Sequence, residues 1–316
     1  MKLIRDYRGL VAPDRGAAVA MGNFDGVHLG HQAVLALAHA AAGELGIPYG
    51  VVTFEPHPRA FFAPGSPPFR LTTAEARAAR MAKLGVEVLY ELAFDQALAA
   101  LEPEAFVEDV LVDGLGVGFV AVGADFRFGR GRSGDVETLK ALGTAAGFGV
   151  VVAPLVCDHV GDYSSTAIRE ALAAGEPARA ARILGHWHRI QGRVEHGKKL
   201  GRELGFPTIN LSLAGLHLPR FGVYAVTVDV LTGAHRGRYP GAASIGVRPT
   251  VAGDTKPNLE VYLIGFSGDL YGEEVSVGLV DFLRPEARYD SLEPLVAQIG
   301  RDVDEARDRL AAANAV

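Results

Sequence analysis

The sequence predicts an α/β domain built on a parallel sheet, followed by an all-β domain, an antiparallel barrel or sandwich, that ends in a helix. Its 316 residues exceed the ~100 to 200 of a usual single domain. From residue 17 to about 184, short apolar runs alternate with helical patterns. Beyond that point the apolar runs have strand spacing with turns between them. We therefore expect domains at 1–184 and 185–316.

Five apolar runs in the first half predict its strands, because buried parallel strands read as continuous apolar segments. They are "AVAMG", "YGVVTF", "VEVLYEL", "VGFVAVG" and "FGVVVAPLV". After the first run, one helical face is formed by Val34, Leu37, Ala38, Ala41 and Leu45. Ligands of such sheets bind at the carboxyl ends of the strands, so the turns there are candidate sites.

The second half contains further strand-like runs bounded by turn residues. They are "GVYAVTVDV", "YPGAASIGV", "LEVYLIGF" and "EEVSVGLVDFL". A final helix is predicted by a stripe of apolar residues, Leu292, Leu295, Val296, Ile299, Ala306 and Leu310.

Composition and charge exclude several classes of protein. A hydrophobic content of 49% with 22% charged residues is typical of a globular protein. The 31 basic residues against 37 acidic ones lack the basic excess of a nucleic-acid binder. A single cysteine, Cys157, permits no internal disulfide and favours a reducing compartment. Without an apolar signal core or a run of ~18 apolar residues, we expect a cytoplasmic protein with no membrane partner.

The stretch "GNFDGVHLGHQ", residues 22 to 32, predicts a strand-to-helix turn that suits a phosphate. The strand ends at Gly22 and helical spacing begins near His31, so free backbone N–H groups and a positive dipole end meet there. Gly30 allows a close approach, and His28 and His31 can donate hydrogen bonds to phosphoryl oxygens. The alternative is a helix-capping turn with incidental histidines.

A second helix start, "SSTAIREAL", offers another anion grip. Ser165 and Thr166 lie at the predicted N-terminus, and Arg169 follows one turn later. Ordinary helix capping explains the hydroxyls equally well.

Two glycine-rich stretches resemble phosphate motifs imperfectly. "GRGRSG", residues 129 to 134, is a literal G-x-G-x-x-G, but it follows the fourth strand, so a plain turn competes with a dinucleotide-binding oxidoreductase. "GRVEHGKK", residues 192 to 199, has Lys199 where a P-loop needs Ser or Thr, which argues against a P-loop kinase. Lys198, Lys199 and Arg202 can still meet phosphates.

Hard oxygen ligands and a carboxylate occur in the second half. Thr208 and Asn210 lie on one side of an extended chain and suit Mg²⁺, although they can equally be solvated polar residues. Glu260 alternates with Leu259 and Val261 and so faces away from their core. It is either a surface residue or a base.

Four motifs in the first half resemble, in order and spacing, the adenylyltransferase module of the bacterial bifunctional riboflavin kinase/FAD synthetases. They are "GNFDGVHLGH", "TFEPHP", "GADFRFGRGRSGD" and "SSTAIR", with Ala167 standing where the family often has a larger residue. The resemblance implies a Rossmann-like nucleotidyltransferase sheet. It implies ATP contacts from Gly22, Asn23, Phe24, Asp25, His28, Gly30, His31, Ser165, Thr166 and Arg169. It implies FMN contacts from His57, Pro58, Phe62, Asp125, Phe126 and Arg127.

The second half resembles the riboflavin kinase module of the same family, which implies a β-barrel. The family's Pro-Thr-Ala-Asn motif appears as "PTIN", and the match continues through "GAASIGVRPT", "LEVYL" and "FLRPEARYDSL". The resemblance implies ATP contacts from Gly197, Lys198, Arg202, Gly205, Pro207, Thr208 and Asn210, with Mg²⁺ on Thr208 and Asn210. Riboflavin is expected at Glu260, the base, with Arg284 and Tyr289 near the end of the last strand.

The resemblance predicts a bifunctional enzyme that uses ATP twice. The second domain makes FMN and ADP from riboflavin, and the first makes FAD and pyrophosphate from FMN. In the second step the nucleophile is already anionic, so His28 and His31 serve as electrostatic clamps and not as bases. A non-catalytic flavin or nucleotide binder and a tRNA-linked enzyme are the alternatives. The sequence does not predict the oligomeric state.

Overall fold

The chain folds into two compact units of different class, as predicted. The computed structural model describes residues 1–154, 157–158, 161–197, 204–249 and 255–314. Unit 1 comprises Met1–Pro67 and Ala74–Tyr163, and unit 2 comprises Pro68–Thr73 and Ser164–Val316.

Unit 1 is built on a parallel sheet of six strands. They are β1 (Lys2–Ile4), β2 (Ala18–Met21), β3 (Tyr49–Glu55), β4 (Val88–Ala93), β5 (Phe119–Gly123) and β6 (Gly149–Ala153), in the order β1-β4-β3-β2-β5-β6. All five predicted runs form strands. No apolar run predicts β1, because it has three residues of which only Ile4 is buried.

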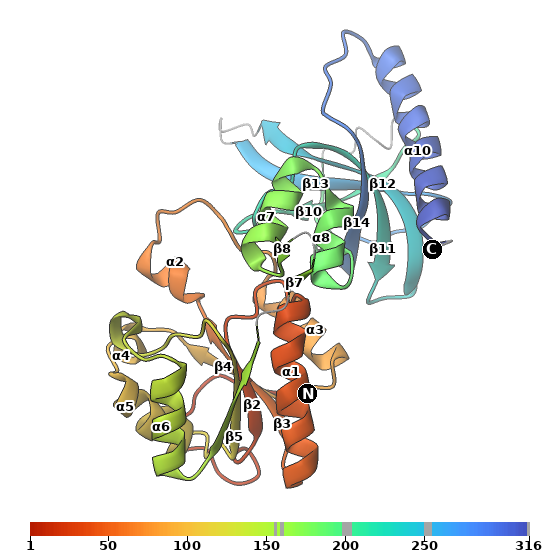
Figure 1. The fold of residues 1–316 in the computed structure, drawn as a ribbon. Coiled ribbons are helices and arrows are strands. Elements are labelled where there is room, and N and C mark those ends of the chain that lie inside the picture. The colour runs from red at the N-terminus through yellow and green to blue at the C-terminus, as the bar shows by residue number, and fades with distance from the viewer. Residues whose placement is uncertain (155–156, 159–160, 198–203, 250–254, 315–316) are drawn as a thin grey trace. The chain divides into compact units, whose positions relative to one another are not determined.

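Helices cover both faces of this sheet (Figure 1). They are α1 (Leu29–Leu45), α2 (Pro58–Phe62), α3 (Ala74–Lys83), α4 (Gln96–Ala99), α5 (Pro103–Ala105), the π-helix η1 (Phe106–Val112), the 3₁₀ turn η2 (Arg130–Arg132) and α6 (Val136–Ala146). A small hairpin, β7 (Cys157–Asp158) and β8 (Gly161–Asp162), follows β6. Ala18 and Ala20 of β2 pack in the same core cluster as α1, whereas Val19 and Met21 pack with η1 and α6 on the opposite face.

The strand order places a topological switch point between β2 and β5. From β2 the chain builds β3 and β4 on one side, and then crosses to add β5 and β6 on the other. Ligands of open α/β sheets bind at the carboxyl ends of the strands at such a point. The turn after β2 and the loop after β5 are therefore the positions that this topology offers to a ligand.

Unit 2 is a curled antiparallel sheet with helices packed on it (Figure 1). Its elements are α7 (Ser165–Ala174), α8 (Pro177–Leu184), β9 (His188–Arg193), β10 (Thr208–Ser212), β11 (Gly222–Val230), β12 (Gly237–Pro249), β13 (Thr255–Leu263), β14 (Glu274–Arg284) and α10 (Leu292–Asn314). The order is β10-β13-β12-β11-β14-β9, and a β-bridge between Glu195 and Asn210 joins the two ends. This bridge favours the barrel over the sandwich.

The predicted terminal helix is present and packs on the barrel. Val303, Ala306 and Leu310 of α10 are buried against Ala225 and Ala242. Leu292, at the predicted start of the apolar stripe, is 56% exposed, so the first turn of α10 contributes little to this contact. In the part of the chain that the structure describes, no helix combines the length and apolar character needed to cross a membrane.

Candidate active sites

The turn after β2 carries two histidines that form one aromatic block. His28 is the N-cap of α1, and its Nδ1 accepts a hydrogen bond of 3.3 Å from the backbone N–H of His31. The two imidazoles stack with ring centroids 3.6 Å apart, and the ring of Phe24 meets His31 edge-on at 5.2 Å. The helix begins at Leu29, slightly earlier than its predicted start near His31, because the His28 side chain caps it.

The backbone of this turn is strained, and it approaches the imidazoles closely. Phe24 and Val27 have left-handed φ values of 52° and 47°, which non-glycine residues rarely adopt. A Cβ on Gly30 would lie 3.1 Å from the His28 ring and 3.2 Å from the carbonyl oxygen of Tyr163. Strain of this kind is typical of ligand-binding turns whose surroundings hold them in place.

Electrostatics keep His31 uncharged. Burial, and after it the neighbouring His28, lower the pKa of His31 well below its usual 6.5. Its Nδ1 is buried and has no hydrogen-bond partner among the described residues. A neutral imidazole with an unused nitrogen at a helix N-terminus is suited to donate a hydrogen bond to an anion.

Two side chains hold this turn from the sheet side. The carbonyl oxygen of Asn23 accepts hydrogen bonds from Thr53 Oγ1 at 3.3 Å and from Arg77 Nη1 at 3.2 Å. No sequence pattern predicts Arg77 as a site residue, because an arginine in a short helix that also carries Glu75, Arg80 and Lys83 is expected to be solvated. Asp25 of the same turn is buried, at 2% exposure.

The motifs proposed for FMN follow the strands on either side of β2. "TFEPHP" ends β3, and "GADFRFG" ends β5, so both lie at the same edge of the parallel sheet as the histidine turn. His57 caps α2, Pro58 is its first residue, and Phe62 is 66% exposed beside Phe61 and Phe94.

The loop after β5 adds further aromatic and charged groups. Phe126 stacks on Phe128 with centroids 5.8 Å apart, and Arg127 pairs with Asp135 at 3.3 Å. Asp125 is exposed, and its carboxylate lies over the end of β5, 3.2 Å from where a Cβ on Gly123 would be. Aromatic surfaces of this kind suit a planar ring such as isoalloxazine.

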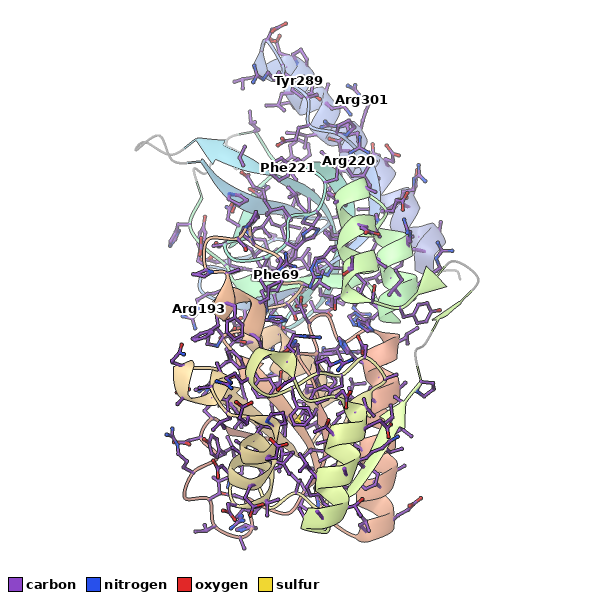
Figure 2. The ribbon with its side chains drawn as sticks, turned by 60° about the vertical axis from the view of Figure 1, so that its left-hand side comes forward. Phe69, Arg193, Arg220, Phe221, Tyr289 and Arg301 are labelled. Carbon is purple, nitrogen blue, oxygen red and sulfur yellow. The ribbon has the colours of Figure 1, made fainter. Side chains whose placement is uncertain are left out.

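The second predicted anion grip belongs to unit 2. Ser165 and Thr166 start α7, but the cap is Ser164, whose Oγ accepts from the N–H of Ala167 at 3.1 Å. Arg169 donates from Nε to the carbonyl oxygen of Phe69 at 2.6 Å. Its guanidinium also lies 5.6 Å from the centroid of the Phe69 ring, which Figure 2 labels. The predicted convergence of His28 and Arg169 joins different units and stays a prediction.

The candidate kinase residues meet across β10, β13 and β12. Glu260 is paired directly with Asn210 on one side and with Ser244 on the other, so all three side chains share a face. Thr208 lies two residues from Asn210 on that face, and Leu259 and Val261 are buried on the other. Asn258, which the sequence analysis missed, donates from Nδ2 to Asn210 Oδ1 at 3.3 Å.

The loop after β9 closes on the same row of side chains. A Cβ on Gly197 would lie 2.3 Å from Asn210 Nδ2, so only glycine fits there. Gly205 has a left-handed φ of 84°, and Pro207 directly precedes β10. Lys198 and Arg202 lie outside the described residues. No group of three or more His, Cys, Asp or Glu within the described ranges is placed to hold a metal ion.

The residues predicted for riboflavin at the end of β14 have other contacts. Arg284 forms a two-pronged ion pair with Asp302 of α10, at 2.8 and 2.6 Å, and this carboxylate raises the pKa of the guanidinium. Tyr289 precedes the start of α10 and is labelled in Figure 2. Their contact with a flavin stays a prediction.

Of the two imperfect glycine motifs, the first forms a local turn and the second begins in a strand. "GRGRSG" contains the 3₁₀ turn η2, with left-handed φ values at Gly129, Gly131 and Arg132. "GRVEHGKK" begins within β9, whereas a P-loop follows a strand and leads into a helix. No helix starts between β9 and residue 197, where this described range ends.

Comparison with known proteins gives consistent matches over nearly the whole chain. Residues 11–167 match the FAD synthetase family, and residues 184–310 match the riboflavin kinase family. Bifunctional riboflavin kinase/FMN adenylyltransferases of Pseudomonas fluorescens and Escherichia coli K12 are 47% and 43% identical, covering 97% and 98% of this chain and 97% of each relative. A crystal structure described as a macrolide-efflux protein of Streptococcus pneumoniae superposes with a TM-score of 0.83 at 31% identity, covering 96% of this chain and 98% of that one.

Proposed function

This chain belongs to the family of bifunctional riboflavin kinase/FMN adenylyltransferases, and from that premise we propose how its residues perform the two reactions. The enzyme phosphorylates riboflavin with ATP to form FMN, and it adenylylates FMN with a second ATP to form FAD. The FAD synthetase match lies in the first part of the chain and the riboflavin kinase match in the second. These matches exclude the alternatives of an oxidoreductase, a P-loop kinase and a non-catalytic binder.

We propose that adenylylation takes place at the turn after β2. The FMN phosphate attacks the α-phosphorus of ATP, and pyrophosphate leaves. Because the nucleophile is already an anion, no base is needed, and His28 and His31 donate hydrogen bonds to the phosphoryl oxygens where charge builds up. The observation that carries this role is a half-buried, uncharged His31 at the N-terminus of α1, whose buried Nδ1 has no hydrogen-bond partner among the described residues.

The remaining first-half residues are proposed as binding groups. The backbone of residues 22–25 and Gly30 holds the triphosphate, with Ser165, Thr166 and Arg169 as a second grip. The exposed aromatic ring of Phe62, with Phe126, gives the isoalloxazine a surface on which to stack. His57, Pro58, Asp125 and Arg127 are proposed to complete the FMN side.

We propose that Glu260 is the base of the kinase reaction. It accepts the proton of the ribityl 5′-hydroxyl as that oxygen attacks the γ-phosphorus of ATP and ADP leaves. Thr208 and Asn210 fit a Mg²⁺ ion, because they present neutral hard oxygens on the face that carries Glu260. The bound ion would neutralise charge on the ATP phosphates. Gly197, Lys198, Arg202, Gly205 and Pro207 are proposed around the nucleotide.

We further propose that the enzyme works in the cytoplasm and that its partners are small molecules. The single cysteine fits the reducing cytoplasm. The molecules it handles are riboflavin, FMN, FAD, ATP, ADP and pyrophosphate, with neither nucleic acid nor membrane among its partners. The acidic balance of the chain argues against RNA.

A pair of substitutions tests the two sites against each other. With riboflavin and ATP supplied, His28→Ala should lower FAD formation by ~10² to 10³-fold while FMN accumulates at the normal rate. Glu260→Gln should lower FMN formation by ~10² to 10⁴-fold while supplied FMN is still converted to FAD. Separation of the flavins by chromatography measures both rates, and each variant is the folding control for the other. Equal loss of both activities in either variant would contradict the assignment.

A further inference from the structure

Unit 1 contains a fully buried arginine that the reaction itself does not explain. Arg77 of α3 has no exposed surface, and it is the largest fully buried side chain among the described residues. Its Nη2 donates to Glu55 Oε2 and to Glu91 Oε2, both at 3.0 Å, and its Nη1 donates to the carbonyl oxygen of Asn23 at 3.2 Å. The Glu91 side chain is 3% exposed and that of Glu55 is 32% exposed.

Stability alone is a weak reason for such a group. Removing a charged guanidinium from water costs several kcal/mol, and well-packed apolar side chains commonly stabilise a core as well as a buried ion pair does. What a guanidinium supplies and an apolar side chain cannot is a planar fork of donors that fixes several acceptors in one geometry. The positions of those acceptors therefore indicate which parts of the fold Arg77 holds in place.

Two of the three acceptors, Asn23 and Glu55, belong to the parts of the sheet edge where the substrates are proposed to bind. Asn23 lies in the turn that leads to His28, Glu55 is the last residue of β3 and opens the proposed FMN segment, and Glu91 lies in the neighbouring strand β4. Arg77 thus ties the turn after β2 to the end of β3 through a single planar group.

The turn also needs outside support. Phe24 and Val27, which follow Asn23, have left-handed φ values that persist only where neighbouring contacts over-determine the backbone. Arg77 and Thr53 donate to the same carbonyl oxygen of Asn23, immediately before this strained stretch.

We propose that Arg77 is a positioning residue for adenylylation. Through Asn23 it fixes the turn that grips ATP, and through Glu55 it fixes the segment that holds FMN, so that the phosphate nucleophile and the α-phosphorus stay aligned. Small errors in such alignment reduce rates steeply. The inference rests on the proposed function, since it takes the turn after β2 as the ATP site, and it gives Arg77 no contact with substrate.

Two substitutions in the full-length enzyme test this role. Thr53→Val removes one donor to Asn23 and leaves the ion pairs intact, so the KM for ATP in FAD formation should rise by about 2- to 10-fold. Arg77→Lys keeps the charge but loses the fork, and kcat/KM for FAD formation should fall by ~10- to 100-fold, with the KM of both ATP and FMN raised. The rate of FMN formation should equal that of the unmodified enzyme in both variants.

Tyr90→Phe is the matched control. Tyr90 is buried in β4 and donates to the carbonyl oxygen of Asp14 at 2.8 Å, away from the turn, so this variant loses a buried hydrogen bond without touching Asn23. Thermal unfolding ranks the three variants by stability. If Arg77 and Thr53 were only structural, the KM values of their variants would match those of Tyr90→Phe at equal loss of stability, and the inference would be wrong.

The outcomes separate this inference from the proposed function. Loss of FAD formation in His28→Ala together with normal KM values in Thr53→Val and Arg77→Lys overturns the role of Arg77 alone. Normal FAD formation in His28→Ala overturns both. If Arg77→Lys does not fold, Thr53→Val decides the question, because it leaves the buried ion pairs unchanged.

Discussion

At the scale of single residues, the histidine pair depends on a glycine beside it. The His28 imidazole caps α1 and stacks on His31, and both are possible because nothing but hydrogen projects from Gly30. Within a helix, alanine is more favourable than glycine by roughly 0.5–1 kcal/mol. Retaining glycine at this position therefore favours the arrangement of the imidazoles over the stability of the helix.

Gly30→Ala should separate these two effects. The added methyl would lie 3.1 Å from the His28 ring and 3.2 Å from a backbone carbonyl, so the ring must move. We expect FAD formation to fall by about 10-fold, with FMN formation unchanged, as measured by flavin chromatography. Gly43→Ala, in the same helix with nothing within 4 Å, is the control and should raise the unfolding free energy by roughly 0.5–1 kcal/mol at normal activity. Identical behaviour of both variants would show that the His28 position is unimportant.

Sequence patterns predict some of these residues and not others. The turn, the two histidines and Gly30 can be predicted because a strand ending and a helix beginning leave a recognisable motif between them. Arg77 cannot, since its burial depends on two carboxylates from other strands, Glu55 and Glu91, that meet only in the folded sheet. Asn258 is missed for the same reason: its contact with Asn210 crosses between strands.

At the scale of elements, apolar runs predict strands well where the strand is long and buried. β11 coincides with the run "GVYAVTVDV", whereas β1 and β9 were missed because they are short or rich in polar residues. β9 begins with a buried histidine, His188, at 3% exposure. Burial, and then His186 and His217, lower the pKa of His188 to about 3.

This buried histidine should make the stability of unit 2 depend on pH. The unfolded chain takes up a proton at His188 below its ordinary pKa of 6.5, but the folded chain does so only near 3. Stability is therefore complete above pH 6.5 and is lost as the pH falls toward 3, by ~2 kcal/mol at pH 5. Urea unfolding followed by the fluorescence of Trp187, the one tryptophan in the chain, measures the loss. His188→Gln should make the unfolding free energy depend less on pH. If the pH dependence were unaltered in that variant, His188 would not be its cause.

At the scale of the whole molecule, the succession of two fold classes is predictable because strand and helix periods change along the chain. Which residues belong to each compact unit cannot be predicted in this way. Residues 68–73 belong to unit 2 although the chain on both sides of them belongs to unit 1. They are held by backbone contacts, such as the N–H of His217 donating to the carbonyl of Arg70 at 2.7 Å, and no local pattern encodes such a pairing.

The predicted boundary between 184 and 185 separates α7 and α8 from elements on which they pack. Ile183 and Leu184 of α8 are buried, and α8 contacts both β9 and β14. The carbonyl of Leu172 in α7 accepts from the N–H of Arg220 at 2.9 Å. The family matches end at 167 and resume at 184, so the sequence comparisons assign these helices to neither module in full.

Two fragments decide where these helices contribute stability. A chain of residues 164–316 should unfold at a temperature at least ~10 °C above that of residues 185–316, because each fully buried aliphatic side chain contributes roughly 1.5–3 kcal/mol. Both fragments contain Trp187, so the same fluorescence signal reports both transitions. Both lack residues 68–73, so that loss is common to them. Equal unfolding temperatures would mean that α7 and α8 add nothing to the kinase fold, and the boundary at 185 would then describe the folding unit.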